Sequence, residues 1–157
     1  MRKIDSIVTR IGDLFFEFQA KLQFFEREYL KNCGIDDVTP NEVKVLYIIG
    51  LSNRKSMSEI AEELKITRGT LSITIDSLVK KVYVIRTRHK QDRRIIIVYL
   101  TEKSIRIVKL YGKFYLELLK SLVKEIKKEK IFVLDEILSK LNKHLESNFY
   151  NFEVIKE

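Results

Sequence analysis

The 157 residues of this chain include 30 lysines and arginines against 22 aspartates and glutamates, so the formal net charge is +8 and a polyanionic partner is favoured. A chain of this length can bury a substantial core without disulfides, and its single cysteine, Cys33, excludes an intramolecular disulfide and favours a reducing compartment. The absence of 18 consecutive apolar residues and of a signal-peptide core argues against membrane contact and secretion, so we expect a soluble, cytoplasmic protein.

The first predicted element is a long amphipathic helix over about residues 4–31. We expect it to end near Gly34, because glycine readily adopts the left-handed conformation that closes a helix. Its apolar residues recur at helical spacing, and the stripe consists of Ile7, Ile11, Leu14, Phe15, Phe18, Leu22 and Phe25. Cys33 lies near the predicted end of this helix, without a resolving thiol or an adjacent cationic cluster, so an inert cysteine is favoured over a redox sensor.

A short helix pair follows. Thr39 is a cap residue and Pro40 suits the first helical position, so a second helix is predicted from here through Leu51. Ser56 and Glu59 form the pattern of a capping box, in which each side chain satisfies the other residue's backbone amide, and they predict a third helix up to residue 64.

Thr67 predicts the cap of a fourth helix over residues 68–80, after a tight turn at 65–66. This order of helices is that of a helix-turn-helix motif. On a helical wheel the predicted inward residues are Leu71, Ile75, Leu78 and Val79. The predicted outward residues are Gly69, Thr70, Ile73, Asp76, Ser77 and Lys80.

Ile73 is an apolar residue in the middle of this polar face. One interpretation is that the face enters the major groove of DNA, where Ile73 packs on a thymine methyl and Gly69 permits close approach. The alternative is that a single exposed isoleucine is ordinary. On the first interpretation, the DNA-binding residues of this helix are Arg68, Gly69, Thr70, Ser72, Ile73 and Thr74.

A β-hairpin is predicted next, with strands at 84–88 and 94–100 around a basic turn. Arginine at such a tip can enter a narrow minor groove. The candidate DNA contacts are Arg86, Arg88, His89, Lys90, Arg93 and Arg94. Asp92 is expected to fix one guanidinium and shape the turn, and Arg94 is the favoured partner. A metal site at His89 is disfavoured because His144 is the only other histidine and the chain has no cysteine cluster.

Thr101 predicts the cap of two further long helix patterns. The first has apolar or aromatic residues at Ile105, Val108, Tyr111, Tyr115, Leu118, Leu122 and Ile126, and the second at Leu134, Ile137, Leu138, Leu141 and Leu145. A helix of ~25 residues is ~37 Å long, more than one small lobe can cover. We therefore expect a two-fold homodimer that reads half-sites about one DNA turn, ~34 Å, apart on a pseudo-palindromic operator.

These residues resemble the MarR family of bacterial transcriptional regulators. The matching segments are Thr39–Pro40, 56–64 (SMSEIAEEL), 66–72 (ITRGTLS), 92–94 (DRR) and 100–103 (LTEK). The resemblance implies a mostly helical fold with a small hairpin wing, in a single domain over 1–157. Its DNA-binding lobe would span 39–101, and its helical dimerisation region 1–35 and 102–157.

Within that family, segments 37–39, 67–70, 86–88 and 113–115 are most similar to the branch that represses fatty-acid synthesis genes. That branch implies a repressor with acyl-acyl carrier protein as corepressor; other members respond to small apolar effectors. The resemblance places an effector pocket between the lobes, with candidate residues Phe15, Phe18, Leu22, Tyr47, Leu51, Tyr111 and Phe114. An aromatic stripe at helical spacing is more often simply core.

Two positions depart from the family pattern. Val82 stands where the family usually has glycine, at the end of the fourth helix; a β-branched residue held in left-handed geometry there costs on the order of 1–2 kcal/mol. Either the cap geometry changes or the strain is tolerated. Ser104 replaces a second common glycine, inside a helix start, where the exchange matters less.

A DNA-binding regulator is the favoured function. The alternatives are a small-molecule-responsive regulator of another pathway and a helical interaction module that has lost DNA binding. An enzyme is disfavoured because the sequence has no nucleophile and base pattern, metal-ligand spacing or glycine-rich phosphate loop, and no cofactor is expected.

Overall fold

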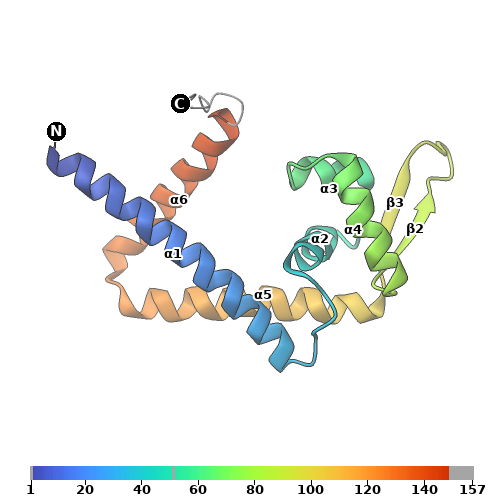
Figure 1. The fold of residues 1–157 in the computed structure, drawn as a ribbon, viewed down its shortest axis with the longest axis horizontal. Coiled ribbons are helices and arrows are strands. Elements are labelled where there is room, and N and C mark those ends of the chain that lie inside the picture. The colour runs from blue at the N-terminus through green and yellow to red at the C-terminus, as the bar shows by residue number, and fades with distance from the viewer. Residues whose placement is uncertain (1, 51, 149–157) are drawn as a thin grey trace. The chain divides into compact units, whose positions relative to one another are not determined.

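The computed structural model describes residues 2–50 and 52–148 (Figure 1). Its elements are α1 (Arg2–Asn32), α2 (Pro40–Gly50), β1 (Arg54–Ser56), α3 (Met57–Glu63), α4 (Arg68–Lys80), β2 (Val84–Arg88), β3 (Ile96–Leu100), α5 (Glu102–Glu125) and α6 (Lys128–Asn148). The chain forms two compact units, Met1–Tyr115 and Leu116–Glu157. The mostly helical fold with a small wing is confirmed.

The predicted start signals of α2, α3 and α4 are confirmed, whereas the Thr101 hydroxyl, predicted to cap the next helix, donates to the carbonyls of Val82 and Tyr83. Ser56 and Glu59 form the complete capping box of α3. The hydroxyl of Thr67 accepts the backbone N–H of Thr70 at the start of α4. A second reciprocal pair was not predicted: the Thr39 N–H donates to Glu42 Oε2 (2.7 Å), and the Glu42 N–H donates to Thr39 Oγ1 (3.2 Å).

The end of α1 also follows the prediction. Gly34 has a φ of +76°, which is the left-handed region that favours glycine. The Ile35 N–H donates to the Leu30 carbonyl (2.9 Å) and closes the helix end.

The sheet has three antiparallel strands in the order β1-β3-β2, one more than predicted. β1 is only three residues long (RKS) and lacks the β-branched run that marks a strand, so sequence patterning does not reveal it. β3 begins at Ile96 rather than at residue 94. Ile95 belongs to the turn, where its N–H donates to the Asp92 carbonyl (3.0 Å).

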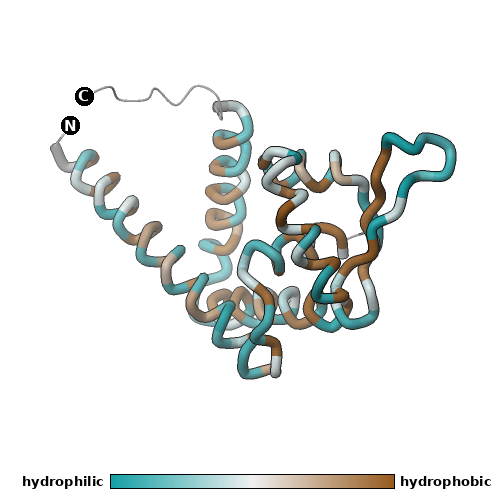
Figure 2. The backbone as a smooth tube through the Cα atoms, turned by 45° about the vertical axis from the view of Figure 1, so that its right-hand side comes forward, coloured by the Kyte–Doolittle hydropathy of each residue, from teal (hydrophilic) through white to brown (hydrophobic). Residues whose placement is uncertain are grey.

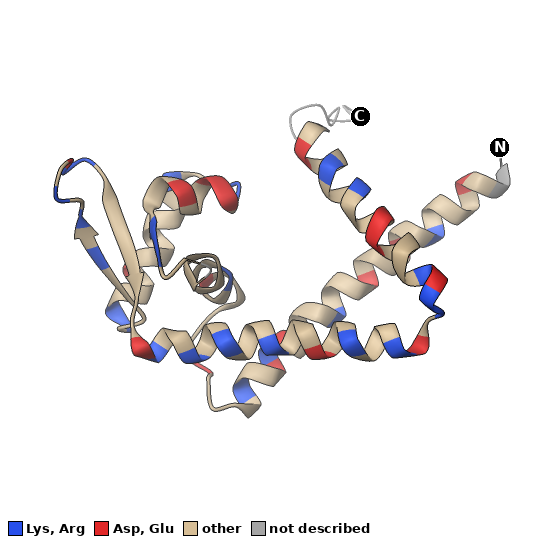
Figure 3. Cartoon of the chain, turned by 180° about the vertical axis from the view of Figure 1, so that it is seen from behind, with Lys and Arg blue, Asp and Glu red and all other residues tan. Residues whose placement is uncertain are grey.

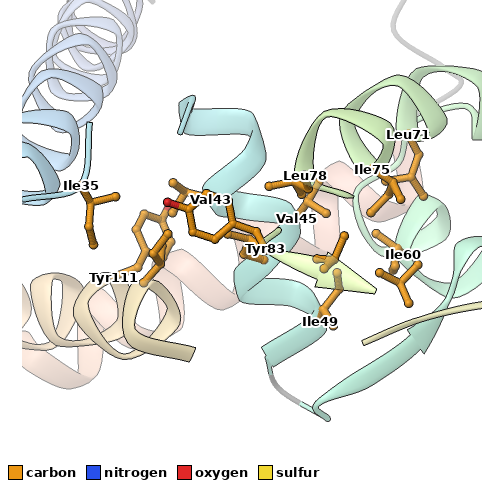
Figure 4. Packing of buried hydrophobic residues seen from close by; sticks show 14 of the residues in the cluster. Ile35, Val43, Val45, Ile49, Ile60, Leu71, Ile75, Leu78, Tyr83 and Tyr111 are labelled. Carbon is orange, nitrogen blue, oxygen red and sulfur yellow. The ribbon is translucent and has the colours of Figure 1, made fainter. Parts of the chain in front are cut away.

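The core of the first unit lies between α2, α3, α4, β3 and the first half of α5, and it extends to the end of α1 (Figure 4). Leu46, Ile49, Ile60, Leu71 and Ile75 are fully buried there. Along the chain, brown apolar stretches alternate with hydrophilic ones, and the tip of the wing is hydrophilic (Figure 2). Leu71, Ile75 and Leu78, three of the four residues predicted to face inward on α4, are buried, so the helical wheel of α4 was largely right.

Two positions of that wheel were wrong. Val79 was predicted inward but is 37% exposed. Ser77 was predicted outward, yet its hydroxyl donates to Glu42 Oε1 (2.7 Å) on α2. Both lie in the last turn of α4, where the helix packs against the start of α2 and a polar side chain finds a buried acceptor.

Two sets of apolar side chains remain exposed. In the first unit they lie along α1 and include Ile7, Ile11, Leu14, Phe15 and Phe18. In the second unit they lie along the C-terminal part of α5 and along α6, and include Leu119, Leu122, Phe132, Ile137 and Leu141. Within the described residues, no helix is long and apolar enough to span a membrane.

Candidate nucleic-acid interface

The outward side of α4 presents the predicted residues to solvent. Ile73 is 74% exposed, while Arg68, Gly69 and Thr70 are exposed beside the helix start. A Cβ atom at Gly69 would have only Thr67 Oγ1 within 4 Å, at 3.8 Å. The fold itself therefore does not require glycine here, and close approach to a ligand stays a prediction.

Several of the predicted polar contacts on α4 have local partners. Ser72 and Thr74 are half-buried. The Thr74 hydroxyl donates to the Thr70 carbonyl (3.4 Å), and the hydroxyls of Thr70 and Thr67 lie 2.9 Å apart. Of the six candidates on this helix, Arg68 and Ile73 are the long side chains that project freely.

Arg86 connects the wing to α4. Its Nη1 donates to Asp76 Oδ1 at 2.7 Å, and both side chains are partly exposed. Arg86 was predicted as a DNA contact; the structure shows its guanidinium paired with an acid. The pair neutralises the carboxylate on the outward face of α4 and ties β2 to that helix.

The turn of the wing is built by His89 and Asp92. His89 Nδ1 accepts the backbone N–H groups of Gln91 (3.3 Å) and Asp92 (3.4 Å). Asp92 Oδ1 accepts the backbone N–H of Arg94 at 2.9 Å. Asp92 does shape the turn, but the predicted pairing with the Arg94 guanidinium was wrong, because the carboxylate binds the main chain instead. Within residues 2–50 and 52–148, Arg88, Lys90, Arg93 and Arg94 form no ion pair. Figure 3 shows basic residues along the wing and its turn.

Charges behind this surface are compensated. Lys81 Nζ lies 2.8 and 2.9 Å from the two carboxylate oxygens of Glu42, which is only 3% exposed. Burial by itself would raise the pKa of Glu42, but hydrogen bonds from Lys81, the Thr39 amide and Ser77 outweigh it and lower that pKa. The pair joins the start of α2 to the end of α4.

A second polar cluster holds the base of the wing. The Tyr83 hydroxyl donates to Asp37 Oδ1 (2.5 Å), and Lys103 Nζ lies 3.9 Å from the centre of the Tyr83 ring. Burial, followed by the hydrogen bond to Asp37, raises the pKa of Tyr83. The cluster fixes the loop before α2, the start of β2 and the start of α5 together.

Val82 lies between these two clusters and keeps the left-handed geometry. Its φ is +61°, and the Tyr83 N–H donates to the Leu78 carbonyl (2.8 Å), which is the pattern of a glycine-type helix end. Thr101 Oγ1 donates to the Val82 carbonyl (2.9 Å). Of the two outcomes left open by the sequence, the cap geometry is therefore retained and the strain tolerated. Ser104 is buried, and its hydroxyl donates to the Thr101 carbonyl (2.8 Å).

The predicted effector pocket is only partly assembled. A shallow groove of about 390 Å³ is lined by Tyr47 and Tyr111 from the predicted set, together with Lys44, Ile48, Leu64 and Tyr115. A hollow of about 530 Å³ at the end of α1 includes Tyr111, Phe24 and Glu26. The other predicted residues that can be placed, Phe15, Phe18, Leu22 and Phe114, line neither of them.

The structure explains why three of these residues line neither hollow. Phe15 and Phe18 lie in the N-terminal part of α1, where they are 47% and 52% exposed. The Phe114 ring packs against Tyr29, with centroids 5.3 Å apart. Leu51 lies outside the described residues.

Glu26 was missed by the sequence analysis. This carboxylate is 4% exposed and accepts hydrogen bonds from the hydroxyls of Tyr111 (3.2 Å) and Tyr115. Burial is the main cause that raises the pKa of both tyrosines, that of Tyr115 to about 12. The available signal was spacing, because Leu22, Glu26 and Leu30 follow one another at i, i+4 and so share one face of α1.

Comparison with known proteins places this arrangement in a family. The family model described as "MarR family" matches residues 38–96. YfiV from Bacillus subtilis, an uncharacterised HTH-type transcriptional regulator, is 33% identical over 112 residues, or 71% of this chain and 69% of YfiV. MdtR, an HTH-type transcriptional repressor from the same species, is 28% identical over 66% of this chain and 65% of MdtR. For the first two curated relatives, the matches span 54% and 65% of the relative's length.

Among solved structures, Streptococcus pneumoniae FabT in complex with DNA superposes with a TM-score of 0.85. It is 26% identical, and the match covers 89% of this chain and 98% of that one. The helix order, the wing and the sequence matches agree. The chain therefore belongs to the MarR family.

Proposed function

We propose that this protein is a sequence-specific DNA-binding transcriptional regulator, and a repressor. The observation that carries the proposal is the contrast in charge pairing around α4. Five basic side chains of α4 and the wing, Arg68, Arg88, Lys90, Arg93 and Arg94, form no ion pair within the described residues, whereas Lys81, Arg86 and Lys103 each do. Arginines without an acidic partner suit binding to DNA phosphates, and the exposed Ile73 suits packing on a thymine methyl group. The similarity to FabT, solved with DNA, supports this function.

The active form that we propose is a homodimer. The exposed apolar stripes on α1 and on the region from residue 116 onward would be covered by a second copy, since contiguous apolar patches of this kind mark interaction surfaces. Two-fold symmetry would place two α4 helices on half-sites one turn, ~34 Å, apart. In this scheme residues 39–101 bind DNA, and 1–35 with 102–157 dimerise.

Equilibrium binding to a labelled duplex carrying a candidate palindrome tests both statements. We expect two protomers per duplex by sedimentation and an affinity that falls steeply with salt. A helical interaction module without DNA binding would instead show weak binding that is equal on all sequences. A monomer that binds a half-site duplex as tightly as the palindrome would contradict the dimer.

For regulation we propose the fatty-acid branch, with acyl-acyl carrier protein as corepressor. Support comes from the similarity to FabT and from the apolar walls that Ile48 and Leu64 give to the groove beside Tyr47. The acylated carrier should tighten DNA binding, and the carrier without its acyl chain should not. Equal effects of both forms would assign the response to the carrier's charge alone.

A small-molecule effector in another pathway is the second candidate, and Glu26 favours it. Among the described residues, the hydrogen bonds to this buried carboxylate come from two tyrosine hydroxyls, which suits a ligand that brings an N–H donor, as an acyl chain does not. An alkylamine that raises the melting temperature of the wild type but not of Glu26→Gln, with no response to the acylated carrier, would favour this candidate over the first.

A further inference from the structure

The wing sheet has a second face, turned away from the core. Val98 of β3 is fully buried, and its register partners Lys55 and Arg86 share its face. Because successive side chains of a strand point to opposite faces, Arg54 and its partner Tyr99 lie on the other side. The short strand β1 thus places an arginine on the outer surface of the wing.

Arg54 opens onto a hollow beside the wing turn. The hollow has a volume of about 610 Å³ and is lined by Arg54, by Ile97 and Tyr99 of β3, and by residues 87–91. A smaller hollow of about 230 Å³ shares Arg54, His89, Ile97 and Tyr99 and reaches the start of α3. The floor is therefore apolar and aromatic, and the rim is basic.

The rim carries an excess of positive charge. Within the described part of the chain, Arg54, Arg88 and Lys90 have no acidic partner. Lys55 is paired with Glu63 on α3. The nearby acid Glu59 is held in the capping box of α3, where the hydrogen bond from Ser56 lowers its pKa.

His89 adds a directed donor to this rim. Its Nδ1 accepts two backbone N–H groups, from Gln91 and Asp92. In a neutral imidazole an accepting Nδ1 leaves the proton on Nε2. The ring therefore offers an N–H group where it lines both hollows.

We infer that this hollow binds a phosphate of the DNA backbone next to the groove entered by the wing, with Arg54 as the principal contact. Guanidinium groups match phosphate oxygens in charge and geometry, and such contacts fix the position of a protein on the duplex. The inference rests on the proposed DNA binding. It adds β1, an element outside the helix-turn-helix and the wing tip, to the interface.

The test compares Arg54→Gln with Lys109→Gln, which removes the same charge from an exposed position on α5, after sedimentation has shown that both variants keep the oligomeric state of the wild type. Affinity is measured from ~0.05 to ~0.3 M salt on a selected duplex and on an unrelated one. Arg54→Gln should weaken binding ~3- to 10-fold on both duplexes at ~0.15 M salt and reduce the salt slope by about 1.8 for a dimer. Lys109→Gln should change the salt slope by much less. Arg54→Lys keeps the positive charge and should retain most of the wild-type slope.

Equal effects of Arg54→Gln and Lys109→Gln would overturn the inference, because they would report net charge alone. If the wild type and Arg54→Gln both bind duplexes with the same salt slope, this inference fails and the proposed DNA-binding function stands. If the wild type binds no duplex, the proposed function fails with it. The last measurement is thermal stability with and without inorganic phosphate at constant ionic strength. If phosphate stabilises the wild type but not Arg54→Gln, and the variant binds DNA as tightly as the wild type, the hollow binds a free anion instead of DNA.

Discussion

Two regions of the molecule differ in how their charged side chains are paired. One is the junction between α2 and α4, and the other is the outer surface formed by α4 and the wing. At the junction, buried Glu42 is satisfied by Lys81, Ser77 and the Thr39 amide. On the outer surface, Arg93 and Arg94 form no ion pair within the described residues, and the nearby Asp92 is turned onto the main chain. The charged side chains that stabilise the fold are thus separate from the unpaired basic side chains that we propose bind DNA.

Arg86 lies between the two groups. It is on the wing, but its guanidinium binds Asp76 of α4. This pair holds the wing against α4 while removing one negative charge from the face that we assign to DNA. The comparison therefore predicts that substitutions at the junction change stability and substitutions on the outer surface change binding.

The largest effect is expected at Glu42. Replacing it by Gln leaves Lys81 partly buried without a counter-charge and should cost about 3 kcal/mol of unfolding free energy. Urea unfolding at pH 7 measures this, with the exposed Glu62→Gln on α3 as control. DNA affinity of the folded fraction should be unchanged; a large loss of affinity at unchanged stability would break the comparison.

The same residue gives a pH dependence. The folded pKa of Glu42 lies below its ordinary value near 4.5, so its contribution to stability is present above that value and is lost as the pH falls through the folded pKa. The difference in unfolding free energy between wild type and Glu42→Gln should therefore shrink below about pH 4.5. A constant difference down to pH 3 would show that the carboxylate charge is not responsible.

The next effect is expected at Arg93. Arg93→Ala should weaken binding about 10-fold on many duplex sequences and flatten the salt dependence, because a phosphate or minor-groove contact is mainly electrostatic. Stability should stay within about 0.5 kcal/mol of the wild type, as for most exposed substitutions. Filter-binding at several salt concentrations, beside Lys113→Ala on α5, would decide; an unchanged slope removes Arg93 from the interface.

A smaller and more selective effect is expected at Ile73. Ile73→Ala should cost about 5-fold in affinity at the cognate site, since the loss of one apolar base contact falls at the lower end of base-readout energies. Random duplex should be bound as before. Exposed Ile85→Ala on β2 is the matched control. Equal losses on cognate and random DNA would contradict base reading by Ile73.

The smallest effect concerns Val82. Val82→Gly should stabilise the protein by up to about 1 kcal/mol, because the relief of left-handed strain is partly offset by the freedom of glycine in the unfolded chain. Gly34→Ala tests the same geometry in reverse, since its φ is +76° and a Cβ there would meet nothing within 4 Å. That variant should be destabilised by a similar amount. No gain at Val82 would mean that its strain is not a cost to the fold.

Local signals predicted the helices well. Capping patterns at Ser56 and Thr67, and glycine at position 34, act within a few residues, so they can be recognised in the sequence. At Val82 the usual glycine of the resembling family left two outcomes open, and the structure shows that the left-handed turn is retained.

Features set by tertiary packing were not predictable in the same way. β1 forms because β3 offers a free edge, not because RKS favours a strand. Glu26 is buried by the tyrosines of α5, 85 and 89 residues away. Asp92 could have bound any of several donors, and only the turn geometry selects the Arg94 amide. Partners as distant as those of β1 and Glu26 leave little trace in a single sequence, whereas Asp92 and Arg94 are two residues apart and the uncertainty there was the choice of donor.

The most direct test of the central claim is the selection of bound sequences from a random duplex library at ~0.15 M salt, with and without acylated carrier protein. We predict enrichment of a palindrome with half-sites about one turn apart, bound more tightly when the acylated carrier is present. A palindrome that is indifferent to the carrier would keep the DNA-binding function and discard the fatty-acid branch. No enrichment of any sequence would contradict the account.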